Sequence, residues 1–152
     1  MFVSETIIDA VVEQLETANF ENVIEHFGKK QPALIGYVFS EDFELLTQSE
    51  REWMLYLIIV MWQSVDKVKG HVPTLNKKAL ESAEERNWEL LETVTTHRFR
   101  DRMDVFFNDS EQEDLLAFIE DSLIEDDDSV VTKEGREPMF VALKSVVDVL
   151  TA

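Results

Sequence analysis

The sequence predicts an all-α fold, a single-domain irregular or orthogonal bundle of six to seven helices. Apolar residues recur at spacings of three and four in nearly every segment, which is the pattern of helices with one buried face. Only four glycines and three prolines interrupt the 152 residues, so helices joined by short connections are expected. The length and the 45% hydrophobic content predict one packed domain over residues 1–152.

Three helices are expected in the first quarter of the chain. Ser4 is a suitable N-cap for the first helix, and Asn19 can begin a short second one. Gly28 is a natural C-terminal stop for that second helix. Pro32 suits the first turn of a brief third helix that extends to Phe39.

The next segment predicts a buried central helix near residues 48–68. Thr47 and Glu50 have the spacing of a capping box, which satisfies two backbone donors at a helix start. The run Trp53–Trp62 is apolar on all sides, and such a helix is normally enclosed by others. Gly70 marks its end.

The second half of the chain predicts the remaining helices. Thr74 begins one helix, and the segment 93–96 is rich in threonine and valine, which favours a break. Ser110 and Glu113 repeat the capping-box spacing at the start of a further helix. Pro138 is expected in the first turn of the last helix.

The charge is strongly negative and unevenly distributed. The formal net charge is −18, from 32 acidic and 14 basic residues. Residues 103–128 contain eleven acidic residues and no basic one, whereas residues 67–102 are slightly basic. Direct binding to nucleic acids or to anionic membranes is disfavoured, because both depend on lysine and arginine.

The chain is expected to be cytoplasmic and to have no membrane span. It contains no cysteine, which excludes disulfides and thiolate metal sites. Glu5, Asp9 and Glu13 interrupt the N-terminal segment, where a secretory signal needs an apolar stretch. The longest apolar run, Trp53–Trp62, is short compared with the about 20 residues that cross a membrane.

No cofactor or metal site is predicted. A di-iron centre in a helical bundle needs Glu-x-x-His, but valine stands three residues before His26, His71 and His97. Asp126 and Asp128 resemble the start of a calcium loop, but Val131 occupies the position that requires glycine. A loose surface site for a divalent cation stays open as a third possibility.

The usual signatures of an enzyme are also absent from the sequence. There is no G-x-S-x-G elbow and no glycine-rich phosphate loop. Carboxylates are so numerous that a pair capable of glycosidase-like or protease-like chemistry can arise by chance, so those roles are unsupported rather than excluded. The sequence favours a protein that is not an enzyme.

A compact cationic group interrupts the acidic chain at residues 97–102. Arg98 and Arg102 share one face of a helix, and two guanidinium groups can hold a phosphate or carboxylate. With His97 beside them, they form the alternative prediction, which is a small enzyme or anion-binding protein. The competing interpretation is that these arginines pair with nearby carboxylates of the chain itself.

The acidic block is the leading candidate for a binding surface. Segregated negative charge favours docking of a basic protein, although it also serves solubility. The predicted partner-binding residues are Asp109, Glu111, Glu113, Asp114, Glu120, Asp121, Glu125, Asp126, Asp127 and Asp128. Trp53 and Trp88 stand beside charged residues, and an exposed tryptophan inside an acidic rim would be a binding hot spot.

The resulting functional hypothesis is a non-catalytic protein-interaction module whose acidic surface binds a basic partner. An inhibitor, an immunity-like factor or a mimic of nucleic-acid charge would all fit it. The sequence does not specify the partner or the oligomeric state.

Overall fold

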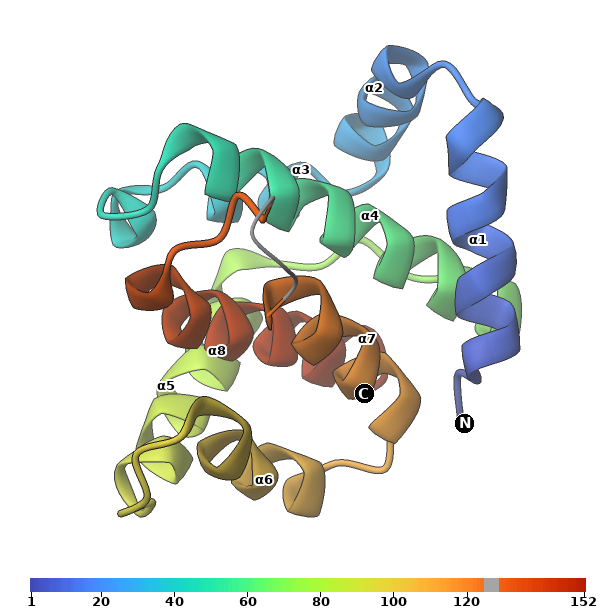
Figure 1. Cartoon of the computed structure of the whole chain (residues 1–152). Helices are drawn as coiled ribbons and strands as arrows, with labels where there is room; N and C mark the ends of the chain where they lie inside the picture. The colour runs from blue at the N-terminus through green and yellow to red at the C-terminus, as the bar shows by residue number, and fades with distance from the viewer. Residues whose placement is uncertain (125–128) are drawn as a thin grey trace.

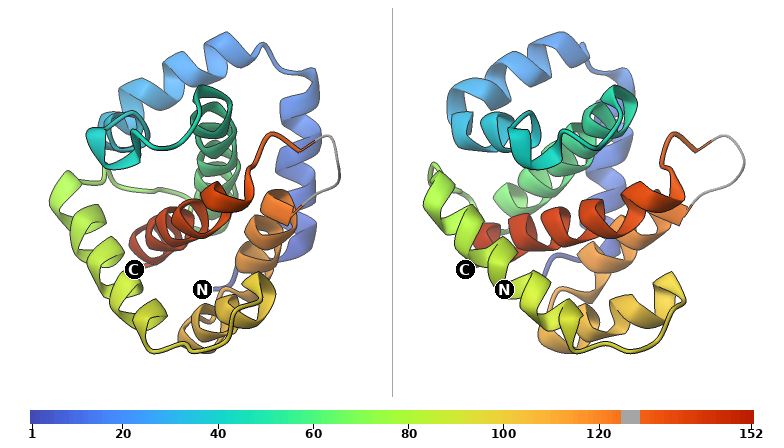
Figure 2. Two further views of the ribbon diagram at one scale, coloured as in Figure 1. Left: turned by 60° about the vertical axis from the view of Figure 1, so that its left-hand side comes forward. Right: turned by 90° about the vertical axis from the view of Figure 1, so that its left-hand side faces the viewer.

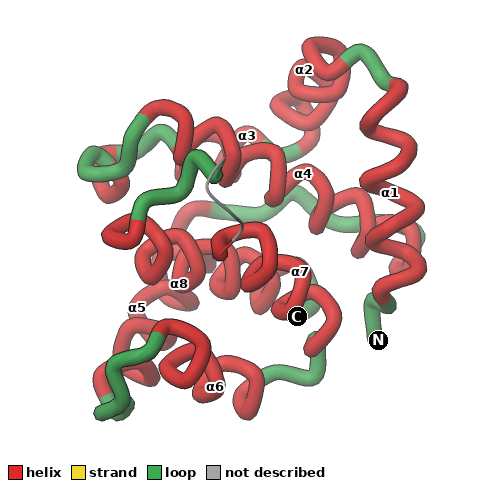
Figure 3. Tube along the Cα trace, viewed as in Figure 1, coloured by secondary structure: helices red, strands yellow, loops and turns green. Residues whose placement is uncertain are grey.

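The computed structural model describes residues 1–124 and 129–152, and this part of the chain is helical without any strand. Eight α-helices and one short 3₁₀-helix, η1, occupy it (Figure 3). In chain order they are α1 (Glu5–Thr17), α2 (Phe20–Lys30), α3 (Pro32–Val38), η1 (Glu41–Phe43), α4 (Gln48–Lys69), α5 (Lys77–Glu92), α6 (Phe99–Asp109), α7 (Glu113–Ile124) and α8 (Lys133–Leu150).

The all-α class is confirmed, but the expected number of six to seven helices is too low. Both breaks that the sequence suggested, at Asn19 and at residues 93–96, are present and give separate helices on either side. At the first, the Asn19 side chain accepts from the Asn22 amide and starts α2. At the second, residues 93–98 form a non-helical connection between α5 and α6.

The helix α2 also continues past Gly28, where the sequence predicted its end. It stops at Lys30, and Gln31, which precedes Pro32, has φ −134° and ψ 61°. Proline disfavours helical geometry in the residue before it, so Pro32 rather than Gly28 separates α2 from α3.

The expected central helix is α4. Both bonds of the Thr47–Glu50 capping box are present, and Gly70 ends the helix with a left-handed φ of 82°. All six residues from Leu57 to Trp62 are buried, so neighbouring elements enclose this part of the helix on all sides.

The last helix shares the centre with α4, and it starts earlier than expected. The prediction that it begins at Pro138 is wrong, because the Thr132 side chain caps it and α8 begins at Lys133. Every residue from Met139 to Val147 is buried. The helix packs against α4, α5, α6 and α7, and Figure 2 shows it surrounded by them.

Helix α1 runs along one side of the molecule and packs against both α4 and α7 (Figure 1). Gln112, directly before α7, fixes its position. Its side chain donates to the Met1 carbonyl at 2.6 Å and accepts from the Val3 amide at 3.0 Å. These bonds join segments 109 residues or more apart in sequence and place one face of α1 beside one face of α7.

One continuous set of buried apolar residues runs through the described helices. None of those helices combines the length and the apolar character that crossing a bilayer requires.

Candidate functional site: an acidic cleft between α1 and α7

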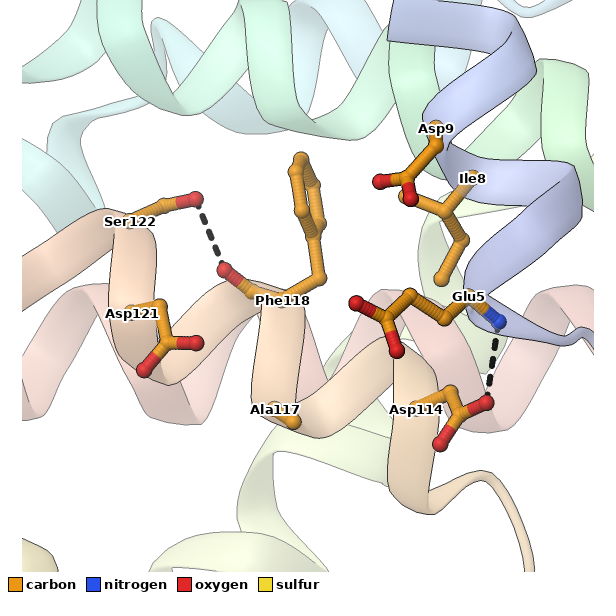
Figure 4. A pocket seen from close by; sticks show the side chains of 8 residues that line it. All are labelled: Glu5, Ile8, Asp9, Asp114, Ala117, Phe118, Asp121 and Ser122. Carbon is orange, nitrogen blue, oxygen red and sulfur yellow. Dashed lines mark hydrogen bonds between the residues drawn. The ribbon is translucent and has the colours of Figure 1, made fainter.

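A cleft of about 360 Å³ lies between α1 and α7 (Figure 4). Both helices contribute to it because each presents residues spaced three and four apart, which share one helix face. Helix α1 supplies Glu5, Ile8 and Asp9, and α7 supplies Asp114, Ala117, Phe118, Asp121 and Ser122.

The cleft combines an apolar base with carboxylates. Ile8 is buried and Phe118 is partly buried, whereas Glu5, Asp9 and Asp121 are exposed. In Figure 4 the side chains of Glu5 and Asp9 extend from α1 toward Phe118 on α7. No lysine, arginine or histidine is among the described residues that line the cleft. Such a surface can bind the cation of a side chain and also the apolar atoms that carry it.

Asp114 has a structural role in addition to its place in the cleft. Its carboxylate accepts from the Glu5 backbone amide at 2.9 Å, at the first turn of α1. The carboxylate satisfies a backbone donor that has no partner within the helix, and its negative charge interacts favourably with the positive end of the helix dipole. Asp114 therefore helps to hold α1 against α7, and a substitution there would change the cleft as well as its charge.

Asp121 is the most available of the predicted residues in the cleft. Its side chain is 69% exposed, and the closest cation within the described chain is Arg100, 3.6 Å away. An exposed ion pair at that distance is weak, so Asp121 keeps most of its capacity to bind a partner.

Two other residues of the predicted acidic surface, Asp109 and Glu120, form ion pairs with basic side chains of the protein itself. Arg86 donates to both oxygens of Asp109, at 3.0 and 2.6 Å, and Lys144 also binds this carboxylate. Glu120 pairs with Arg100. Burial raises the pKa of Glu120 although Arg100 acts in the opposite direction.

The remaining predicted acidic residues fall into two groups. Glu111 and Glu113 are exposed near the start of α7. The other four, Glu125, Asp126, Asp127 and Asp128, lie outside the described residues.

Lys144 forms a buried polar network that the sequence reasoning missed. Its ammonium group is fully buried and lies 2.6 Å from Asp109, 2.8 Å from Asp148 and 3.0 Å from the Asn87 amide oxygen. Arg86 adds a second cation to the two carboxylates, so the charges of the group balance. The pKa of Asp109 is lowered because hydrogen bonds and charge from Arg86 and Lys144 outweigh burial, which acts to raise it.

This network is structural rather than catalytic. It joins α5, the end of α6 and α8, and the three donors of the ammonium group already have three acceptors. A buried amine with all its donors engaged has no free direction from which to approach a substrate.

The cationic group at residues 97–102 is partly used within the chain. The Arg102 guanidinium binds both oxygens of Glu137, at 3.0 and 2.9 Å, and also the Thr96 carbonyl at 3.1 Å. This pairing raises the pKa of Arg102. His97 and Arg98 are exposed. The alternative anion site therefore lacks one of its two guanidinium groups unless Glu137 is displaced.

Metal binding gains no support from the described ranges. Within them, no group of three or more histidine, cysteine, aspartate or glutamate side chains is arranged to hold a metal ion. The segment that suggested a divalent cation, residues 126–128, lies outside the described residues.

Comparison with known protein families, with curated proteins and with solved structures gave no match to this chain.

Proposed function

We propose that this protein is a non-catalytic interaction module whose acidic cleft between α1 and α7 binds a basic segment of another protein. The observation that carries the proposal is the lining of the cleft, where carboxylates from two helices flank Ile8 and Phe118 without a basic side chain among the described lining residues. An inhibitor, an immunity-like factor or a charge mimic would each fit this mode of binding.

The chemistry of recognition follows from the cleft's two kinds of surface. Glu5, Asp9 and Asp121 would bind guanidinium or ammonium groups, and bidentate carboxylate–arginine pairs are the strongest of these contacts. The apolar base would cover the aliphatic stem of the same side chain. The net charge of −18 would accelerate the encounter with a basic partner, and salt would weaken that effect.

The groups of the cleft favour binding over catalysis. The hydroxyl that lines it, on Ser122, donates to the Phe118 carbonyl at 2.7 Å within α7. A nucleophilic serine needs an adjacent base instead. A cytoplasmic location remains part of this proposal, as does the exclusion of nucleic acids as direct ligands.

The test compares two variants with the same change in net charge. The cleft variant carries Glu5→Gln, Asp9→Asn and Asp121→Asn. The control variant carries Glu21→Gln, Glu25→Gln and Glu52→Gln at exposed positions of α2 and α4 outside the cleft. The partner is first captured from a lysate at low salt and then titrated against each purified variant.

The cleft variant should lose at least about tenfold in affinity, and the control should lose much less, because only the first removes contacts. Wild-type affinity should also fall steeply as salt rises. Equal losses in both variants would mean that net charge alone attracts the partner. Binding that is insensitive to salt would contradict an electrostatic interface.

A further inference from the structure

A second surface cavity, of about 320 Å³, lies between the loop after α3, helix α5 and the first turns of α8. Five apolar side chains line it, from Phe43, Leu45, Leu46, Trp88 and Pro138. It shares no lining residue with the cleft between α1 and α7. We refer to it as the Trp88 groove.

Two large apolar residues of the groove are open to solvent. Leu45 is 96% exposed and Trp88 is 36% exposed. Isolated exposed apolar residues are ordinary, but here two of them border one apolar cavity. Tryptophan is also the residue type most enriched in the energetic centres of protein interfaces.

The polar edge of the groove is acidic. Asp42 and Glu134 line it, and no basic residue is among the described residues that do. The charge of Asp42 also reaches Glu84, whose carboxylate accepts from the Tyr37 hydroxyl at 2.9 Å. Burial raises the pKa of Glu84, the Tyr37 hydroxyl acts to lower it, and the charges of Asp42 and Glu81 raise it further.

We propose that the Trp88 groove is a second docking site, which accepts a large apolar side chain carried on a basic segment of a partner protein. The apolar lining selects the inserted side chain, and Asp42 and Glu134 select lysine or arginine beside it. A second copy of this chain is a poor occupant, because two molecules of charge −18 repel each other. This site stands independently of the cleft between α1 and α7.

Three peptides test the two requirements separately. The probe is acetyl-KKLFLKK-amide, and its controls are acetyl-KKSSSKK-amide, which keeps the charge, and acetyl-EELFLEE-amide, which keeps the apolar residues. Each is titrated into the ¹⁵N-labelled protein, and the Trp88 indole N–H and the Leu45 amide are followed by NMR. Only the probe should shift both signals in a saturable way. No shift with the probe, or equal shifts with either control, would overturn the proposal.

Substitutions then locate the binding. Trp88→Ala should weaken the probe at least about tenfold, and Leu45→Ser should weaken it while leaving the fold intact, because Leu45 is 96% exposed. Val68→Ser, at an exposed apolar position on α4 outside the groove, is the matched control and should have no effect. If Leu45→Ser and Val68→Ser both bind like the wild type, the groove is not the site.

Two further measurements separate this proposal from its competitors. The triple cleft variant should keep the probe-induced shifts of Trp88 and Leu45, and their loss would mean that the peptide binds between α1 and α7. Sedimentation velocity of the protein alone should show no self-association that depends on Leu45, which is tested by comparing the wild type with Leu45→Ser. Such an association would identify a second copy as the occupant and overturn the choice of a basic partner.

Discussion

Glu50 of α4 accepts two hydrogen bonds from Thr132, one from its amide and one from its hydroxyl, each 2.9 Å long. Thr132 is the N-cap of α8. The other oxygen of Glu50 accepts from the Thr47 amide at 2.9 Å, which closes the capping box of α4. One buried carboxylate therefore organises the starts of the two helices that form the centre of the molecule.

Replacing this carboxylate should destabilise the protein strongly. Glu50→Ala removes the acceptor of three hydrogen bonds and leaves the Thr47 and Thr132 amides without it, so the free energy of unfolding should fall by roughly 3 kcal/mol. Urea denaturation measures this. Glu52→Ala, at an exposed position on the same helix, should change stability by less than about 0.5 kcal/mol. Similar losses in the two variants would mean that Glu50 does not link the helices.

The carboxylate of Glu50 also explains why position 135 is a glycine. A Cβ at Gly135 would lie 2.0 Å from Oε2 of Glu50, whereas a Cβ at Gly36 would meet no atom within 4 Å. Gly135→Ala should destabilise the protein by about 1–3 kcal/mol because Glu50 must leave its partners. Gly36→Ala should be neutral or stabilising by up to about 1 kcal/mol, since alanine favours a helix. Thermal unfolding of both variants measures the difference, and equal stability of the two would mean that Glu50 does not require a glycine at position 135.

Acid should remove the contribution of Glu50. Burial acts to raise its pKa, but hydrogen bonds from Thr47 and Thr132 outweigh burial and lower it below the ordinary value of 4.5. The unfolded chain then takes up the proton more readily than the folded one. The stabilisation is therefore present above about pH 4.5 and is lost as the pH falls through the folded pKa.

The measurement is the free energy of unfolding between pH 7 and pH 3, a range that brackets the ordinary carboxylate pKa values. Asp109, whose pKa is also lowered, contributes a slope of the same sign. Glu50→Gln should flatten part of the acid slope, and Glu52→Gln should leave the slope unchanged. A wild-type slope in the Glu50→Gln variant would contradict the proposed linkage.

Local signals made much of the fold predictable from the sequence. The start and end of α4 depend on the capping box that Thr47 and Glu50 form with each other and on Gly70, and these contacts are local in the sequence. The start of α8 was misplaced because Pro138 suggested a beginning there, whereas Thr132 caps the helix by accepting from the Gly135 amide, and Glu50, 82 residues away, holds Thr132 in place. A contact between distant segments leaves no periodic pattern in the sequence.

The candidate site shows the same division between local and distant effects. The acidic character of α7 could be read directly, and Asp114 and Asp121 lie in the cleft as part of the predicted surface. Glu5 and Asp9 also show helical spacing, but their place opposite α7 depends on Gln112 binding the first residues of the chain. Sequence reasoning likewise treated Asp109 as surface charge, because its partner Lys144 could not be paired with it before the helices were in place.

Removing the cation from that network should be far more damaging than removing one from the surface. Lys144→Met leaves Asp109 and Asp148 to share one cation, Arg86, in place of two, and removing one partner of a buried ion pair typically costs about 3–5 kcal/mol. Lys29→Met breaks another pair spaced four residues apart on a helix, Lys29–Glu25, whose side chains are 75% and 67% exposed. It should change stability by less than about 0.5 kcal/mol.

A double variant separates a lost ion pair from a mere packing defect. Adding Asp148→Leu to Lys144→Met removes one of the two carboxylates together with the cation, so that Arg86 again balances the remaining carboxylate of Asp109 and part of the lost stability should return. The coupling energy between the two substitutions should be about 1–3 kcal/mol, as expected for residues that share one network. If instead the two losses add, Lys144 contributes through its packing over Phe106 rather than through Asp148.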